Sequence, residues 1–413
     1  MRRRGTAGFL IGAVVLLLPV PGAAAAPSTA PTTSARPTAD TAAPTPSAPL
    51  VTPPPRGTAP DGSTVGGRQL GARGTVFAED APSLPPGLGA SAWLVADATS
   101  GAVLAARDAH GRYYPASTLK TLTLLTLLHR LDPARVVEAT EDDERVEGSR
   151  VGLVAGGRYP VSLLFEALVL QSGNDAASAL ARTAGGQQQT VAAMNATAAS
   201  LGAFDTVAGS PSGLDVAGQT SSAYDLALIF RAVLEDPATA AVLRVPSATI
   251  PPVEGRSPGF QIQNQNPLAG YPGGLGGKTG FTDAARHTFV TAAERDGRRL
   301  VVSVLDTENV PLRAADQAAL LLDWGFAVPV GSPGVGRLVR PDDLLPTAAP
   351  APAAPTSEPP RTAAPPADEP APVLLPALGA AAVLSATLLG AGLARRRRRR
   401  RMARPAGTGP PGR

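Results

Sequence analysis

Only two of the 37 basic residues in this 413-residue chain are lysines, and each lies in a setting that suits chemistry. The first, Lys120, ends the stretch Ser-Thr-Leu-Lys, in which Ser117 opens an apolar run typical of a buried helix. Residues three apart share one face of a helix, so we expect the amine beside the Ser117 hydroxyl. A buried lysine loses the hydration that favours its charged form, and it can then take the proton of a serine nucleophile. A capping Ser117 with a snorkelling Lys120 explains the same pattern without chemistry.

The second lysine, Lys278, stands in Gly-Gly-Lys-Thr-Gly-Phe-Thr at 276–282, a stretch whose pattern predicts a strand. Glycine in a strand lets a ligand approach the backbone closely, and an open strand edge can bind an extended peptide. Lys278 and Thr279 could then meet a carboxylate of that peptide. A turn or a phosphate-binding loop is the alternative, although Pro272 occupies the place of the first glycine in the phosphate-loop pattern.

A third polar cluster, Gln-Ser-Gly-Asn-Asp at 171–175, follows an apolar run and contains Ser172 and Asn174. Side chains two residues apart can both face one cleft, where the hydroxyl could relay a proton and the amide could hold a substrate amide. A serine or asparagine helix cap explains this cluster about as well.

The rest of the composition excludes several other chemistries. The chain has no cysteine, which rules out disulfides, thiol nucleophiles and thiolate metal sites. Its three histidines lie far apart without metal-ligand spacing, so we expect no metal and no other cofactor.

The formal net charge of +4 comes from the two ends of the chain. Twelve of the 37 basic residues are arginines within 2–4 and 395–413, and the other 25 are outnumbered by 33 acidic residues. The part between the ends is therefore mildly acidic, and nucleic-acid binding is not expected.

Hydrophobic periodicity separates strands from helices along the chain. Strands are expected at 93–96, 102–105, 276–282, 288–293 and 300–305, and helices at 117–131, 160–181, 190–201, 222–234 and 313–324. Because the helices fall mainly between two groups of strands, this order favours an α+β fold with an antiparallel sheet and a helical insertion. A doubly wound parallel sheet fits the order less well.

The ends of the chain have the composition of export and anchoring segments. Three arginines, an apolar stretch and small residues at 23–25 predict a signal peptide over 1–26. The uncharged segment 373–394 is long enough, at ~1.5 Å per residue, for one transmembrane helix, and the arginine-rich tail at 395–413 should stay cytoplasmic. Three segments are expected between these ends: a Pro/Ala/Thr-rich disordered linker at 27–75, a folded domain at 76–340 and a Pro/Ala-rich stalk at 341–372. We therefore expect an exported single-pass membrane protein with its folded domain on the extracellular or periplasmic side.

The three polar clusters together form a more specific pattern than any one of them. Ser-x-x-Lys, Ser-x-Asn and Lys-Thr-Gly, in this order on an exported chain, are the motifs of serine penicillin-recognising enzymes. Over about 90–325, including the stretches LFEALVLQSGNDAASALA and NQNPLAGYPGGLGGKTGFT, the chain resembles the low-molecular-mass penicillin-binding proteins, specifically the serine D-alanyl-D-alanine carboxypeptidases. The resemblance implies a β-lactamase/transpeptidase-like fold, an antiparallel sheet with flanking helices and an all-helical subdomain. It also implies removal of the terminal D-alanine from peptidoglycan stem peptides, with β-lactam antibiotics as inhibitors.

The resemblance also implies a catalytic role for residues of the first two motifs. Ser117 would be the acylated nucleophile and Lys120 its general base. Ser172 would relay the proton to the leaving group, and Asn174 would orient the substrate amide.

The third motif and a later arginine would bind the substrate. Lys278, Thr279 and Gly280 would line the strand edge beside it. The backbone N–H of Phe281, with that of the nucleophile, would form the oxyanion hole. Arg313 would bind the terminal carboxylate of the substrate.

Other functions share part of this pattern. A class A-like β-lactamase needs a deacylating glutamate, but the only glutamates between the second and third motifs, Glu235 and Glu254, lack the Glu-x-x-Leu-Asn context. A catalytically silent wall-tethered binding protein is a second alternative, although all the required side chains are present. Transpeptidase and endopeptidase action use the same acyl-enzyme and stay open. Arg286 replaces a glycine found in many relatives, and it would either change substrate preference or face solvent.

Overall fold

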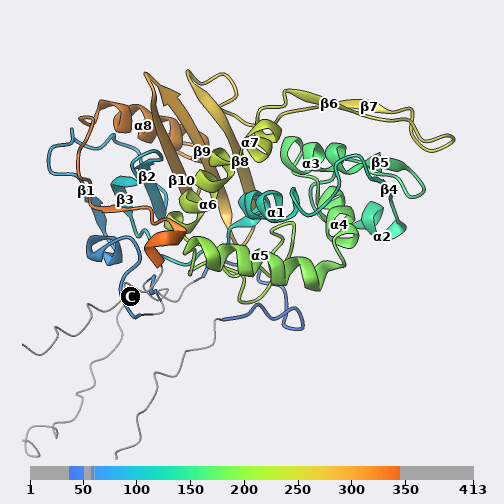
Figure 1. Ribbon diagram of the computed structural model, residues 1–413, viewed down its shortest axis with the longest axis horizontal. Helices are drawn as coiled ribbons and strands as arrows, with labels where there is room; N and C mark the ends of the chain where they lie inside the picture. The colour runs from blue at the N-terminus through green and yellow to red at the C-terminus, as the bar shows by residue number, and fades with distance from the viewer. Residues whose placement is uncertain (1–36, 51–56, 60, 345–413) are drawn as a thin grey trace, which may run out of the picture. The chain divides into compact units, whose positions relative to one another are not determined.

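An antiparallel sheet forms the centre of the structure, a computed structural model that describes residues 37–50, 57–59 and 61–344 (Figure 1). Its main strands lie in the order β1-β3-β2-β10-β9-β8, and β11 also pairs with β3. The strands are β1 (Thr75–Phe77), β2 (Ala92–Asp97), β3 (Ala102–Arg107), β8 (Gly274–Thr282), β9 (Arg286–Arg295), β10 (Arg298–Thr307) and β11 (Gly336–Arg337). Among the described strands β8 pairs only with β9, so its other edge is open.

The two faces of the sheet pack against different helices, because successive side chains of a strand point to opposite sides. Val302 lies in an apolar cluster with side chains of α8 (Ala314–Ala327). The next residue, Val301, lies in the larger core with side chains of α6 (Ala223–Glu235). The sheet is therefore covered by α8 on one face and by α6 on the other.

The segment between β3 and β8 forms a mainly helical region beside the sheet (Figure 1). Its further helices are α1 (Lys120–Leu127), α2 (Glu141–Arg145), α3 (Val161–Leu170), α4 (Asn174–Thr183), α5 (Gln187–Leu201) and α7 (Pro237–Leu243). It also holds two small two-stranded sheets, β4 (Val136–Glu138) with β5 (Arg158–Pro160) and β6 (Ser247–Ile250) with β7 (Phe260–Gln263). Helix α1 packs against α3, α5 and α6, so it is central to this region. The expected α+β fold with a helical insertion is confirmed.

Two helices differ most from their expected extent. The helix expected over 117–131 begins as a 3₁₀ turn at Ala116–Leu119 and its α-helical part ends at Leu127. The helix expected over 160–181 is wrong as a single element, since α3 ends at Leu170 and α4 begins at Asn174. The break is stabilised by tertiary contacts, among them the hydrogen bond from Asn174 N to the Ser149 carbonyl, which a local apolar pattern does not report.

The packed part of the chain begins before the expected boundary at residue 76. Val65 and Leu70 are buried in the larger core, and the backbone of Asp40 pairs with that of Ala217. Toward the other end, the segment 341–344, expected to open the stalk, forms a 3₁₀ turn. Leu344 packs against the core there.

Most of the expected terminal segments lie outside the described residues. These are the signal peptide at 1–26, the transmembrane segment at 373–394, the tail at 395–413, most of the stalk and part of the linker. Within the described ranges, no helix combines the length and the apolar character needed to cross a bilayer.

Candidate active site

The Ser117 hydroxyl is carried by the 3₁₀ turn that leads into α1. The residue before it, Ala116, has a φ of 48°, a left-handed conformation that non-glycine residues adopt only when neighbours hold it. Here the carbonyl of Pro115 accepts hydrogen bonds from the hydroxyls of Thr118 at 2.6 Å and Thr288 at 2.9 Å. The turn is thereby fixed both to its own helix and to β9.

Lys120 is fully buried directly beneath this turn, with its Nζ 3.0 Å from Ser117 Oγ. Its other two neighbours are acceptors only: Asn174 Oδ1 at 2.7 Å and the Ser212 carbonyl at 2.6 Å. A neutral amine has two N–H donors, which these two oxygens satisfy, and one lone pair, which is then left for the Ser117 hydroxyl. Three oxygens thus surround the amine: as an ammonium it donates to all three, and as a neutral amine it can accept the proton of the Ser117 hydroxyl.

The electrostatics of the pocket favour the same neutral form. Burial, and after it the positive charge of Lys278, lower the pKa of Lys120 well below its ordinary value, while the charge of Asp175 acts in the opposite direction. The Lys278 amine is buried as well, and burial lowers its pKa to about 7. The structure therefore places one lysine of weakened basicity beside the Ser117 hydroxyl and a second close enough for its charge to act on the first.

Asn174 and Ser172 lie at the break between α3 and α4. The Asn174 amide is oriented at both ends, since its Oδ1 accepts from Lys120 and its Nδ2 donates to the Glu147 carbonyl at 2.7 Å. Ser172 is nearly buried and has a left-handed φ of 57°. The structure thus brings Asn174 into contact with Lys120, whereas no hydrogen bond joins Ser172 to Ser117 or Lys120 among these described residues.

Strand β8 passes alongside the Ser117 turn. A Cβ at Gly280 would lie 2.8 Å from Ser117 N and would overlap the Thr288 hydroxyl, so only glycine permits this approach. Lys278 points toward the buried side of the strand, and its Nζ donates to the Thr279 carbonyl at 2.9 Å. The next residue after Gly280, Phe281, is half exposed at the open edge.

Arg313 is the residue that precedes α8, the helix that covers the face of the sheet opposite to α6. It forms a bidentate ion pair with Asp316, at 2.8 and 2.9 Å, and its side chain is 63% exposed. A small cavity of about 130 Å³ is lined by Arg313 together with Thr279, Gly280 and His287. The structure thus brings Arg313 near Thr279 but already paired with a carboxylate.

Arg286 lies at the start of β9 with a φ of 54°. The guanidinium forms a bidentate pair with Glu308, at 2.7 and 2.8 Å, and lies 5.7 Å from the centre of the Phe281 ring. The guanidinium is therefore paired while the side chain stays 31% exposed, and both sequence alternatives, a changed substrate preference and a solvent-facing side chain, stay predictions.

One cluster among the described residues has the types of a metal site, namely His110, Asp205 and Asp225. Both ring nitrogens of His110 already have hydrogen-bond partners, Asp205 Oδ2 at 2.8 Å and the Val65 carbonyl at 3.0 Å. Asp205 also accepts from Arg112 at 2.9 Å. These contacts describe a buried hydrogen-bonded network, which stabilises the packing of the N-terminal segment.

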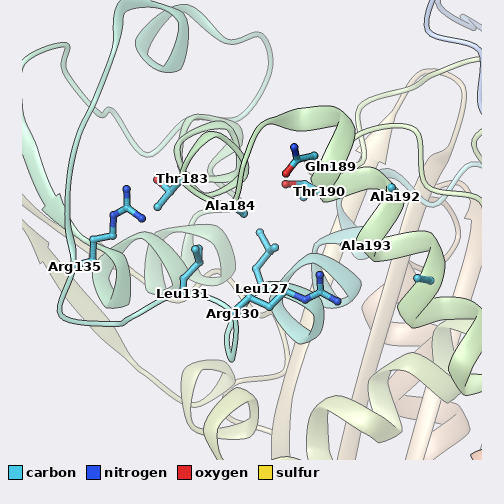
Figure 2. A pocket seen from close by; sticks show the side chains of 11 residues that line it. Leu127, Arg130, Leu131, Arg135, Thr183, Ala184, Gln189, Thr190, Ala192 and Ala193 are labelled. Carbon is cyan, nitrogen blue, oxygen red and sulfur yellow. The ribbon is translucent and has the colours of Figure 1, made fainter.

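A wider surface cavity of about 640 Å³ lies away from the candidate site (Figure 2). It is formed by the C-terminal ends of α1 and α4 and by α5, with Leu131 and Ala184 among its apolar residues and Arg130 and Arg135 at its sides. None of the residues of the three motifs lines it. The candidate site is therefore the cluster of side chains where the Ser117 turn, the start of α4 and β8 meet.

Three contributors to this cluster were not singled out from the sequence. The carbonyls of Ser212 and Glu147 act through the backbone, for which no residue type gives a signal. The glycine at position 213 is the nearest residue-type signal for the Ser212 carbonyl, because its φ of 82° and its close approach to Ala116 require glycine. Asp175 was visible beside the second motif, but its partners are backbone groups far along the chain.

Comparisons with known proteins agree with this geometry. The family model described as D-alanyl-D-alanine carboxypeptidase, peptidase S11, matches residues 78–309. The chain is 48% identical over 245 residues to D-alanyl-D-alanine carboxypeptidase DacB2 of Mycobacterium tuberculosis, covering 58% of this chain and 83% of that protein. It is 35% identical over 258 residues to D-alanyl-D-alanine carboxypeptidase DacD of Salmonella typhimurium, covering 58% of this chain and 64% of that protein.

Solved structures give the same result for the fold. The crystal structure of a D-alanyl-D-alanine carboxypeptidase from Mycobacterium tuberculosis H37Rv is similar with a TM-score of 0.60 and 45% identity, covering 64% of this chain and all of that chain. The S96A mutant of the Streptomyces K15 DD-transpeptidase is similar with a TM-score of 0.55 and 25% identity, covering 59% of this chain and all of that chain. The described part of the chain thus has a penicillin-binding, transpeptidase-like fold.

Proposed function

The chain belongs to the peptidase S11 family of D-alanyl-D-alanine carboxypeptidases, and we propose that it removes the terminal D-alanine of peptidoglycan stem peptides through an acyl-enzyme on Ser117. The observation that carries this proposal is the contact of Ser117 Oγ with the buried Lys120 amine at 3.0 Å. In its neutral form that amine donates its two N–H groups to Asn174 Oδ1 and the Ser212 carbonyl, which leaves its lone pair for the hydroxyl.

Acylation begins with transfer of the Ser117 hydroxyl proton to neutral Lys120. The resulting alkoxide attacks the carbonyl carbon of the penultimate D-alanine, forming the Oγ–C bond and a negative charge on the carbonyl oxygen. The backbone N–H groups of Ser117 and Phe281 stabilise that charge. When the C–N bond breaks, the proton held by Lys120 passes through Ser172 to the leaving nitrogen of D-alanine.

Hydrolysis of the acyl-enzyme repeats these steps with water as the nucleophile. Lys120, neutral again after acylation, takes a proton from water, and the hydroxide displaces Ser117 from the acyl carbon. The proton then returns to Ser117 Oγ. Asn174 holds the amide of the bound peptide throughout, because its own amide is fixed by Lys120 and the Glu147 carbonyl.

The substrate lies along the open edge of β8 in this proposal. An extended peptide can pair with the unpartnered backbone groups of an edge strand. Its terminal carboxylate would then reach Thr279 and Arg313, which share a small cavity. Arg313 must exchange its pairing with Asp316 for the substrate, an exchange between exposed groups that costs little.

A fluorescent penicillin and a stem-peptide mimic ending in D-Ala-D-Ala test this function together. The wild-type protein should become labelled and should release free D-alanine, whereas Ser117→Ala should do neither. Rapid turnover of the penicillin without D-alanine release would instead identify a β-lactamase. If the folded wild-type protein takes no label, the enzyme function fails and the alternative of a catalytically silent binding protein is supported.

Transpeptidation is a second candidate, favoured by the likeness to the K15 DD-transpeptidase. The same acyl-enzyme would then pass to an amine instead of water. Adding an amine acceptor such as glycine to the D-alanine assay separates the two, since a transpeptidase forms the new peptide at the expense of hydrolysis.

We also propose that the protein is exported and anchored by one C-terminal span, with the catalytic domain outside. The support is the sequence: the signal-like segment 1–26, the uncharged segment 373–394 and the arginines that follow it. Full-length protein should sediment with membranes, and a variant ending at residue 372 should be released. Retention of the truncated variant in the membrane fraction would contradict the proposal.

A further inference from the structure

Asp175 is a fully buried carboxylate at the start of α4, next to Asn174. Its Oδ1 accepts from the backbone N–H groups of Val151 at 3.0 Å and of its neighbour Ala176 at 2.9 Å. Its Oδ2 accepts from the N–H groups of Gly152 at 2.8 Å and Leu153 at 3.0 Å. Four N–H donors therefore converge on one carboxylate, and three of them belong to a segment more than 20 residues earlier in the chain.

That earlier segment, 147–153, is the same loop that holds Asn174. The Glu147 carbonyl accepts from Asn174 Nδ2 at 2.7 Å, and the Ser149 carbonyl accepts from the Asn174 backbone N–H at 2.8 Å. Between them, Gly148 has a φ of 79°, and a Cβ there would lie 2.8 Å from Asn174 Nδ2. The 147–153 loop thus lies directly against the catalytic amide.

The two sets of contacts interlock. Asp175 binds the 151–153 end of the loop, and the other end presents its carbonyls to Asn174. Because the Nδ2 group must face the Glu147 carbonyl, the Oδ1 atom must face Lys120, which it contacts at 2.7 Å. The loop therefore selects which end of the Asn174 amide meets the lysine.

We infer that Asp175 is a positioning residue for the reaction: through the 147–153 loop it fixes the orientation of Asn174, and its buried charge acts on the general base Lys120. This inference rests on the proposed function. A carboxylate is needed at this position because it accepts all four hydrogen bonds, whereas an amide has one accepting oxygen and would turn its own N–H groups toward N–H donors.

The charge of Asp175 has a separate effect on Lys120. Two charged groups face the Lys120 amine, Lys278 from β8 and Asp175 from α4, while Ser117, Asn174 and the Ser212 carbonyl are neutral. Asp175 is the one that favours protonated Lys120, so its removal lowers the pKa of the lysine further. The acid limb of the pH–rate profile should therefore move to lower pH in a variant without this charge.

The experiment compares wild type with Asp175→Asn, which keeps the size of the side chain and removes the charge. The rate constant for acylation by a fluorescent penicillin is measured from pH 5 to 10, normalised to folded protein by circular dichroism. We expect a fall of roughly 10- to 100-fold, as for a reacting group displaced by about 1 Å, together with a shift of the acid limb to lower pH. Asp143→Asn is the matched control, because Asp143 is also buried and hydrogen-bonded but serves Thr140 and Arg182.

The outcomes separate this inference from the proposed function. If wild type labels but Asp175→Asn labels at the same rate, or loses rate with an unmoved limb, the inference fails and the proposed function stands. If wild type takes no label, the proposed function itself fails. Should Asp175→Asn not fold, Asp175→Glu decides, since it keeps the charge but displaces the oxygens by one methylene. It should retain the acid limb and lose rate, and an unchanged rate would overturn the inference.

Discussion

Replacing Gly280 with alanine adds one methyl group at the closest approach between β8 and the nucleophile. The new Cβ would lie 2.8 Å from Ser117 N and 3.0 Å from Ala116 Cβ, and it would overlap the Thr288 hydroxyl. None of these neighbours is free to move, because Thr288 and Ala116 are buried and the turn is tied to Thr288 through Pro115. The strand itself must therefore withdraw.

The size of the effect follows from that displacement. An ordinary contact of 3.4 Å with Ser117 N requires β8 to withdraw by about 0.6 Å. The residue that moves with Gly280 is Phe281, whose N–H we propose as one of two oxyanion donors. Loss of one such donor lowers the rate by about 10²–10³-fold. We expect Gly280→Ala to acylate slower by a factor within or just below that range.

The assay is the rate of acylation by fluorescent penicillin at saturating reagent, with D-alanine release measured in parallel. Gly270→Ala is the control, because a Cβ at Gly270 meets nothing within 4 Å and the residue lies in the turn just before β8. Thermal unfolding of both variants monitors stability. If folded Gly280→Ala acylates at the wild-type rate, β8 does not supply an oxyanion donor and the substrate geometry proposed above is wrong.

Three further predictions concern the charged groups. The rate of D-alanine release should rise with pH as neutral Lys120 forms, and the apparent pKa of this rise should lie well below 10.5. The reason is that a lowered pKa extends the neutral form of the lysine to lower pH. An acid limb of the pH–rate profile near 10.5 would contradict this prediction. Lys278→Gln removes the positive charge that is the second cause, next to burial, of the lowered pKa of Lys120. The acid limb of the pH–rate profile of this variant should therefore move to higher pH. A limb that stays in place or moves to lower pH would refute the electrostatic coupling of the two lysines. Arg313→Gln should raise KM for a D-Ala-D-Ala peptide by about tenfold with a smaller change in kcat, because it removes a charge-assisted hydrogen bond to the carboxylate. An unchanged KM would remove Arg313 from the site.

The motifs could be located from the sequence because each depends on local spacing. Ser117 and Lys120 lie one helical turn apart, and this spacing alone predicts the contact that the structure shows at 3.0 Å. The strands β8 to β10 were likewise expected from the sequence, at 276–282, 288–293 and 300–305. The family followed from the order of the three motifs.

Contacts that depend on distant backbone groups could not be found in this way. The break at 171–173 lies in the polar cluster that contains Gly173, but the Ser149 carbonyl that accepts from Asn174 N belongs to a distant segment of the chain. The acceptors of the Lys120 amine include the Ser212 carbonyl, 92 residues away. The burial of Val65 and Leu70 was missed because two apolar residues within a Pro/Gly-rich segment give no periodicity.

The central claim is that Ser117 is the acylated residue, and intact-protein and peptide mass spectrometry after treatment with benzylpenicillin tests it most directly. The account predicts one acyl adduct on the wild-type protein, located on the peptide that contains Ser117, and none on Ser117→Ala. An adduct on another residue, or an equal adduct on the folded Ser117→Ala variant, would contradict it.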